Sequence, residues 1–188
     1  ATLLPDGKVL AVGGFLGAVT LGSAEIYDPT TNTWSPATSM AGVRGAHTAT
    51  LLPTGKVLVA GGAGAAGYIA TAELYDPVAN TWSPAGSLAI DRGAHTTTIL
   101  PNGKLLAAGG YNSGTGRLAS AEIYDPVADT WSAAASLTAA RRWHSATLLP
   151  TGKVLVAGGE DGLGYLASAE VYDPTAGKPE KLFDAACG

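Results

Sequence analysis

The chain has 188 residues, of which 46% are hydrophobic and 14% are charged, and its formal net charge is −4 at pH 7. This composition excludes an intrinsically disordered chain and is sufficient for one domain with a hydrophobic core. The small excess of acidic residues and the lack of any basic run argue against nucleic acid as a partner.

One block of sequence near the start of the chain occurs four times. Residues 3–14 reappear with few changes as residues 51–62, 99–110 and 148–159. A second block, Ala-Glu-x-Tyr-Asp-Pro, occupies residues 24–29 and recurs from Ala72, Ala121 and Ala169. A period of about 48 residues is typical of propellers, solenoids and arrays, in which each unit buries its apolar face only against its neighbours.

The third repeat, residues 92–136, shows the order of the elements in one unit. Residues 95–100 are a short run rich in β-branched residues, and the sequence Pro101-Asn102-Gly103 follows them. Residues 104–108 are a second apolar run, which stops at a glycine pair. Because proline and asparagine favour turns and glycine tolerates a positive φ, this half of the repeat predicts a β-hairpin.

The second half of the same repeat predicts two more strands. A polar, glycine-rich loop over residues 111–120 leads into a strand over residues 121–124. Asp125-Pro126 then opens a turn, and Thr130-Trp131 begins a fourth strand. Four strands with a glycine pair and an aromatic residue at fixed offsets are typical of a propeller blade. No segment combines a helical apolar period with helix caps, so we expect no helix.

The elements Arg-x-x-His, Gly-Gly, Tyr-Asp-Pro and Thr-Trp follow one another in this order, and together they resemble the kelch repeat over about residues 1–174. The resemblance, which extends to bacterial kelch proteins and the central domain of galactose-oxidase-like proteins, implies an all-β propeller of four-stranded blades. About four blades would lie in this chain, over residues 1–38, 44–86, 92–135 and 141–174. Residues 175–188 would form an irregular C-terminal tail, in which residues 181–183 could add a short strand.

The two ends of the chain do not match the repeat. Thr-Trp and Arg-x-x-His each occur three times, whereas the other two elements occur four times, and both missing copies belong to the same stretch of the unit. Three alternatives are open: a piece of a longer propeller, an unusual four-bladed ring, or a ring completed by another chain. Because an open end exposes a strand edge and an apolar blade face, we expect self-association or a larger assembly.

Repetition itself predicts structural roles for most of the polar and aromatic residues. Histidines in one register of successive blades are too far apart to share a metal ion, so we expect no metal at His47, His95 and His144. The repeated Glu25, Glu73, Glu122 and Glu170 cannot form the close carboxylate pair of a glycosidase, so we expect ion pairs with Arg44, Arg92 and Arg141. The repeated tryptophans and tyrosines predict packing between blades.

The resemblance includes galactose and glyoxal oxidases, which imply copper and a tyrosine cross-linked to a cysteine. The only cysteine, Cys187, lies outside every predicted blade, so this cross-link cannot form in a blade and an intrachain disulfide is excluded. We therefore predict no catalytic residue, no cofactor and no enzyme activity. We expect a non-catalytic binding or interaction module that uses the loop face of the propeller. The alternatives are a non-catalytic segment of a larger secreted enzyme and a structural assembly subunit.

Residues that break the repeat are the candidates for ligand binding, because loops on a rigid scaffold carry function. In a four-stranded blade, the loop between the second and third strands and the link to the next blade lie on one face. Aromatic and charged residues interrupt these loops mainly in the third and fourth repeats, and they suit a protein or carbohydrate ligand. The candidates are Tyr68, Tyr111, Arg117, Arg142, Trp143, Glu160, Asp161 and Tyr165. The alternative is that they are ordinary loop residues.

Membrane insertion is not expected. The most apolar stretch, residues 58–72, is interrupted by four glycines and contains a predicted strand and a loop. From the resemblance to bacterial and secreted kelch-like proteins, we expect an extracellular, periplasmic or cell-surface location.

Overall fold

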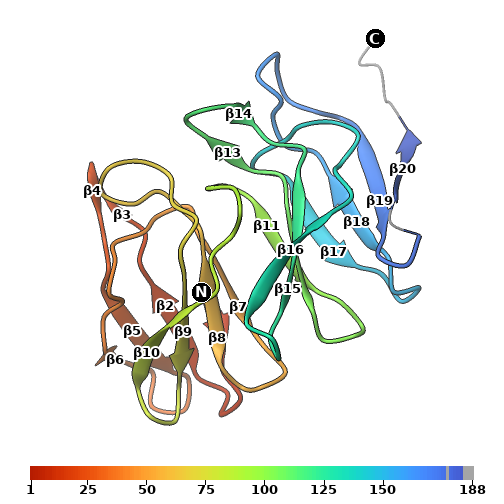
Figure 1. Ribbon diagram of the computed structural model, residues 1–188. Helices are drawn as coiled ribbons and strands as arrows, with labels where there is room; N and C mark the ends of the chain where they lie inside the picture. The colour runs from red at the N-terminus through yellow and green to blue at the C-terminus, as the bar shows by residue number, and fades with distance from the viewer. Residues whose placement is uncertain (177, 184–188) are drawn as a thin grey trace. The chain divides into compact units, whose positions relative to one another are not determined.

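The computed structural model describes residues 1–176 and 178–183, and these residues form β-strands and no helix (Figure 1). The strands build four antiparallel four-stranded sheets, one for each sequence repeat, together with two small hairpins. The chain divides into two compact units, residues 1–93 and 94–188, and each unit holds two of the sheets. The predicted all-β architecture and the number of blades are therefore confirmed.

The first unit contains the first and second sheets. The first sheet consists of β1 (Thr2–Leu3), β2 (Val9–Val12), β5 (Ala24–Asp28) and β6 (Thr33–Ala37). The second consists of β7 (Thr48–Leu51), β8 (Val57–Ala60), β9 (Ala72–Asp76) and β10 (Thr81–Ala85). A short hairpin of β3 (Phe15–Leu16) and β4 (Val19–Thr20) lies in the loop between β2 and β5.

The second unit repeats this arrangement. The third sheet consists of β11 (Thr96–Ile99), β12 (Leu105–Ala108), β15 (Ala121–Asp125) and β16 (Thr130–Ala134). The fourth consists of β17 (Ser145–Leu148), β18 (Val154–Ala157), β19 (Ala169–Asp173) and β20 (Lys178–Phe183). A hairpin of β13 (Tyr111–Asn112) and β14 (Gly116–Arg117) occupies the loop between β12 and β15.

The Tyr-Asp-Pro block builds the turn between the third and fourth strands of a sheet. In the first sheet, the Asp28 carboxylate accepts the backbone N–H of Thr30 at 2.9 Å, and Asn32 takes a left-handed φ of 55°. The Tyr27 hydroxyl donates to Oδ1 of Asn32 at 2.8 Å. Equivalent bonds join Tyr75 to Asn80 and Tyr124 to Asp129. The tyrosine, the aspartate and the residue that ends the turn recur together because they stabilise one turn geometry.

Each unit has its own hydrophobic core between its two sheets. In the first unit the core contains Leu4, Leu10, Met40, Val57, Val59 and Tyr75. In the second unit it contains Leu100, Leu106, Leu137, Val154, Val156 and Tyr172. Aliphatic residues of the second strands, of the turns before them and of the links between sheets thus pack with a ring from a third strand. This packing explains the apolar runs that end at the glycine pairs.

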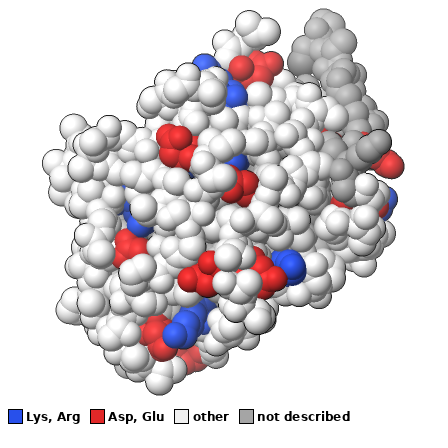
Figure 2. All heavy atoms as spheres, in the orientation of Figure 1, with Lys and Arg blue, Asp and Glu red and all other residues white. Residues whose placement is uncertain are grey.

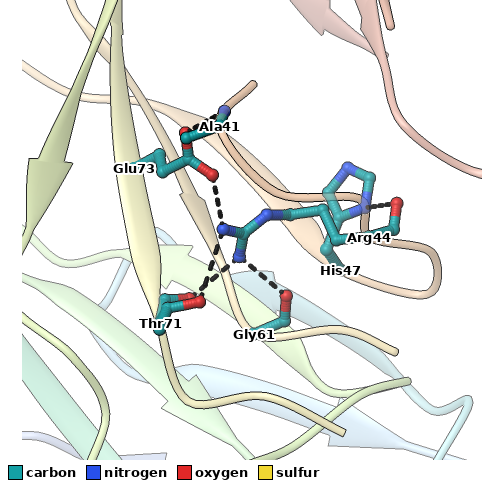
Figure 3. Close-up of polar contacts among 6 residues, drawn as sticks. All are labelled: Ala41, Arg44, His47, Gly61, Thr71 and Glu73. Carbon is teal, nitrogen blue, oxygen red and sulfur yellow. Dashed lines mark hydrogen bonds and ion pairs between the residues drawn. The ribbon is translucent and has the colours of Figure 1, made fainter. Parts of the chain in front are cut away.

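A buried ion pair lies where the chain enters the second sheet (Figure 3). Arg44 precedes β7, and its Nη2 lies 2.7 Å from Oε1 of Glu73 on β9, with only 2% and 9% of the two side chains exposed. Nη1 of Arg44 donates to the carbonyl oxygens of Gly61 and Thr71. Oε2 of Glu73 accepts the backbone N–H of Ala41 at 2.8 Å, so the pair also holds the segment that arrives from the first sheet.

The second unit contains the same pair. Arg141 Nη2 lies 2.8 Å from Oε1 of Glu170, and neither side chain is exposed. The Glu170 carboxylate also accepts the backbone N–H groups of Thr138 and Ala139, which belong to the segment between the third and fourth sheets. These two pairs have the structural role that the repetition of Arg and Glu predicts.

The chain after Pro174 differs from the prediction of an irregular tail from residue 175. The six-residue strand β20 pairs with β19 from Asp173↔Lys178 to Ala169↔Phe183, with a β-bulge between Ala169 and Glu170. Strand pairing needs backbone donors and acceptors rather than the Thr-Trp sequence, and a proline is tolerated on an edge strand. The strand is longer than the one expected at residues 181–183. Cys187 lies outside the described residues.

The tryptophans pack less tightly than the sequence predicts. The buried rings are Tyr75, Tyr124 and Tyr172, each 2% exposed or less. Trp82 and Trp131 are half-buried, with their ring centroids 4.9 Å from Tyr75 and 5.1 Å from Tyr124, and Trp34 is 55% exposed. Each of these three tryptophans lies on the fourth, outermost strand of its sheet, so it covers its tyrosine from one side while its own outer side faces solvent.

Candidate functional site

The links between successive sheets and the loops between second and third strands meet at one end of the sheets, as the sequence predicts. In the first unit an isolated β-bridge joins Gly45, in the link between the sheets, to Ala63, in the loop after β8. In the second unit the equivalent bridge joins Arg142 to Glu160. Figure 1 shows the β13–β14 hairpin and the loop between β18 and β19 at the same end of the second unit, opposite the β15–β16 turn. The candidate residues of the second unit therefore belong to loops that lie together.

Glu160 is the centre of the polar contacts in these loops. Its Oε1 accepts from Nη2 of Arg117, which comes from the β13–β14 hairpin. Its Oε2 accepts from Nε of Arg142, which comes from the link between the third and fourth sheets. One carboxylate thus fixes two guanidinium groups from different loops. The hydrogen bonds from Arg117 and Arg142 lower the pKa of Glu160, and the bond to Glu160 raises the pKa of Arg117.

Two aromatic rings flank the arginines. The Cζ atom of Arg142 lies 3.9 Å from the ring centroid of Trp143 and 4.9 Å from that of Tyr111. Arg117 Cζ lies 5.6 Å from the Tyr111 centroid. These distances are within the range of cation–π contacts. Five of the eight candidates, namely Tyr111, Arg117, Arg142, Trp143 and Glu160, therefore form one cluster, which we call the arginine–tryptophan cluster.

The conformation of Trp143 is unusual for such a large residue. Its φ is 56°, in the left-handed region, and 63% of its surface is exposed. The equivalent residues of the other links are Ala46 and Ala94, at φ 50° and 53°. The loop geometry therefore requires a left-handed residue at this position, and here it presents an indole ring to solvent. A bulky residue with this φ is rare and marks a position that warrants a functional explanation.

Arg142 occupies a position that is glycine in the other two links. At the equivalent Gly45, the ring of Phe15 lies so close that an added Cβ would clash with it. At Gly93 the ring of Tyr68 takes the same place, with 2.6 Å to an added Cβ. In the first unit an aromatic ring therefore packs on bare backbone. In the second unit the ring of Tyr111 faces a guanidinium group instead.

The remaining three candidates do not join the cluster. The Asp161 carboxylate accepts the backbone N–H groups of Leu163 and Gly164, so it stabilises the turn of its own loop. Tyr165 forms a backbone bridge with Glu160, but its side chain is 92% exposed. Tyr68 belongs to the first unit and packs on Gly93. Tyr68 and Asp161 thus have local structural contacts that the sequence pattern does not reveal.

The histidines contact the scaffold. Nδ1 of His47 lies 3.1 Å from the carbonyl oxygen of Arg44, and Nε2 of His144 lies 2.9 Å from the hydroxyl of Thr96. Their rings pack on the first glycine of a glycine pair: an added Cβ would lie 2.8 Å from His47 at Gly13 and 2.7 Å from His144 at Gly109. Among the described residues, no three His, Cys, Asp or Glu side chains are grouped so as to hold a metal ion.

Three cavities among the described residues lie away from the arginine–tryptophan cluster. One of about 550 Å³ in the first unit is bordered by Arg44, Glu73 and Trp82. Its two ionisable groups are already paired with each other, so it offers no free acid or base. None of the eight candidates borders this cavity or the two smaller ones found in the described part of the chain. The arginine–tryptophan cluster is therefore separate from these three cavities, and it reaches the surface at Trp143, which is 63% exposed.

Basic side chains form no large patch on the face shown in Figure 2. On the face shown in Figure 2, arginine and lysine side chains are few and most lie beside aspartate or glutamate. This view shows no basic patch of the kind that binds a phosphate backbone. The described residues also contain no helix that is long and apolar enough to span a membrane.

Comparison with known proteins agrees with the repeat structure. The family model of the kelch motif matches residues 1–41, 44–89, 92–138 and 144–178. No curated protein matches the chain. The solved structure of a protein called YjhT is similar over 100% of this chain and 66% of its own, with a TM-score of 0.80 and 17% sequence identity. This chain thus spans slightly less than two thirds of that protein, and at this identity the likeness shows the fold alone.

Acidification is predicted to destabilise the protein through its histidines. Burial, followed by the nearby charges of Arg44 and Arg141, lowers the pKa of His47 and of His144 to about 4. In an unfolded chain a histidine titrates near pH ~6.5. Between these values the unfolded chain binds more protons, so the free energy of unfolding falls as the pH is lowered from about 6.5 to about 4, by at most ~3 kcal/mol per histidine. Urea unfolding at several pH values between 4.5 and 7 measures how the free energy of unfolding depends on pH.

The matched control is His144→Gln, which removes one titrating group from the folded and the unfolded states. We expect this variant to lose less stability than the parent between pH 7 and 4.5, whatever its stability at pH 7. An unchanged slope would show that His144 is not buried in its neutral form.

Proposed function

The chain belongs to the kelch family, and from this premise we propose that it is a non-catalytic binding module that contacts its ligand through the loop face of the second unit. The kelch propeller is a general interaction fold, and the proposed ligand is a protein or a carbohydrate. The contact residues we propose are those of the arginine–tryptophan cluster, with Tyr165 beside it. We also propose an extracellular, periplasmic or cell-surface location, in line with the sequence resemblance.

The observation that carries this proposal is the exposed indole of Trp143. An exposed tryptophan in the left-handed region has no role in the scaffold, because alanine fills the same position in the other two links. Tryptophan, tyrosine and arginine are the residues that contribute most to binding free energy at interfaces. The salt bridges to Glu160 hold the two arginines in place without a ligand, which reduces the entropic cost of binding.

The absence of catalysis is part of the proposal. A carboxylate or histidine that acts as a general acid or base must be free to exchange a proton. In the cluster, both oxygens of Glu160 accept hydrogen bonds from arginines, and these bonds favour the ionised form. His144 packs beneath the loops on Gly109. These contacts support binding more readily than chemistry.

We predict that the double substitution Arg142→Gly with Trp143→Ala abolishes ligand binding without unfolding the protein. It creates the Gly-Ala sequence that residues 45–46 and 93–94 already have. The probes are an array of neutral and acidic glycans and an array of acidic, basic and proline-rich peptides. The control is Val127→Ala, which alters a residue that is 95% exposed in the turn at the opposite end of the same unit.

The parent and the control should bind the same probe, and the double variant should not bind it. Binding that survives the double substitution would exclude the cluster as the contact site. Failure of the folded parent to bind any probe on either array would count against a binding module of this kind.

Self-association is a second proposal, and it is favoured by the first sheet. Leu3 on β1 is 63% exposed and Trp34 on β6 is 55% exposed, whereas the equivalent Leu51 and Trp82 of the second sheet are half-buried. In the second sheet the carbonyl of Thr38 accepts from the indole N–H of Trp82 at 2.7 Å, so the segment from the previous sheet covers this ring. The first sheet therefore presents apolar side chains that another chain can cover.

Sedimentation velocity at micromolar concentration tests this proposal. The chain should sediment as a dimer or larger species, and Leu3→Asp with Trp34→Ser should shift it toward the monomer. A parent chain that is monomeric at these concentrations and does not bind a hydrophobic dye would contradict self-association.

A further inference from the structure

We infer that the ligand of the arginine–tryptophan cluster is a neutral carbohydrate, with a pyranose ring stacked on the open face of Trp143 and its hydroxyl oxygens accepting hydrogen bonds from Arg142 and Arg117. This inference rests on the proposed binding function and names its ligand. Three properties of the cluster lead to it: its charge balance, its unused donors and its aromatic platform.

The charges of the site balance. Within the cluster, Arg117 and Arg142 supply two positive charges and Glu160 supplies one negative charge. Asp161 lies outside the cluster but follows Glu160 directly in the same loop, and it supplies the second negative charge of the site. Each guanidinium is already paired with Glu160. A ligand carboxylate or phosphate at these arginines would meet the Glu160 carboxylate at close range, and a basic ligand would meet the guanidinium groups. A neutral ligand avoids both repulsions.

Unused hydrogen-bond donors predominate at the site. Among the guanidinium nitrogens, Arg142 uses only Nε and Arg117 uses only Nη2, while both oxygens of Glu160 accept hydrogen bonds. The other Nη groups of the two arginines have no hydrogen-bond partner among the described residues, and they are not among the buried unpaired atoms. They therefore reach solvent and can donate. A ligand at this site must offer uncharged acceptors, and sugar hydroxyl oxygens meet this requirement.

Trp143 supplies a flat apolar platform beside these donors. Arg142 covers one side of its ring at 3.9 Å, while 63% of the residue remains exposed, so the other side is open. The C–H face of a pyranose is flat and apolar, and it packs on an indole while its hydroxyls remain at the edge. Tyr165, 92% exposed and bridged to Glu160 through its backbone, offers a second ring on the same loop.

The cluster is also held in its binding geometry before a ligand arrives. The backbone bridges Arg142↔Glu160 and Glu160↔Tyr165 connect the link and the loop. The Arg142 side chain is fixed by Glu160 on one side and by the rings of Trp143 and Tyr111 on the other. Little rotamer freedom remains to be lost on binding, which favours recognition of a small rigid ligand on an open surface.

Isothermal titration of the full chain with defined sugars tests the inference. The neutral probes are cellotetraose, maltotetraose and galactobiose, and the acidic probe is trigalacturonate. We expect saturable binding of at least one neutral probe that changes less than about twofold between 50 and 500 mM NaCl, because a neutral ligand is little affected by screening. Trp143→Ala and, separately, Arg142→Gly should each weaken this binding at least tenfold. Val127→Ala should leave it unchanged, and thermal melting verifies that all variants fold.

The outcomes separate this inference from the proposed function. The neutral-carbohydrate inference is wrong, and the binding function stands, if the acidic probe binds more tightly than the neutral probes and its binding is lost at high salt. The same conclusion follows if only peptides bind and their binding depends on Trp143. If neither sugar nor peptide binding depends on Trp143, both are wrong. Binding of a neutral sugar that survives Trp143→Ala would also overturn the inference, since the stacking platform would not be used.

Discussion

The buried pairing of an arginine with a glutamate is the interaction on which the repeat architecture depends. Arg44 and Arg141 each stand before the first strand of a sheet and contact a glutamate on the third strand, Glu73 or Glu170. Each glutamate also accepts backbone N–H groups from the segment that arrives from the previous sheet. A charge that is buried in this way is strongly destabilising if its partner is removed. The pair therefore fixes where one repeat ends and the next begins.

Once the link is fixed at the arginine, the next three residues occupy defined positions. The histidine packs on the first glycine of the pair in the preceding repeat, which is why the Arg-x-x-His and Gly-Gly elements recur together. The two residues between them emerge on the loop face, and the second of these is left-handed in every link. In two links they are glycine and alanine, and in the third they are Arg142 and Trp143. The same constraint that builds the scaffold thus presents an arginine and a tryptophan to solvent.

The repeat, its four strands and the loop face can be predicted from the sequence, because they follow from short-range patterns that occur four times. The five residues of the arginine–tryptophan cluster can also be predicted, since each of them departs from the repeat in the same set of loops. The sequence does not show that Glu160 joins Arg117 to Arg142, because this depends on the bridge between two loops. The sequence predicts at most a short strand at residues 181–183, whereas β20 begins at Lys178, because backbone pairing alone forms it. Tyr68 and Asp161 break the repeat pattern, but their contacts are local.

Comparison of Glu73→Ala with Glu25→Ala in equilibrium unfolding tests the central claim most directly. The two glutamates have the same place in the repeat, but Glu73 is buried against Arg44, whereas Glu25 is exposed and has no side-chain partner among the described residues. Loss of Glu73 should lower the free energy of unfolding by about 3–5 kcal/mol. Loss of Glu25 should change it by no more than ~0.5 kcal/mol, as for an ordinary surface residue. Equal effects of the two substitutions would contradict the account, because the buried pair would then not hold the repeats together.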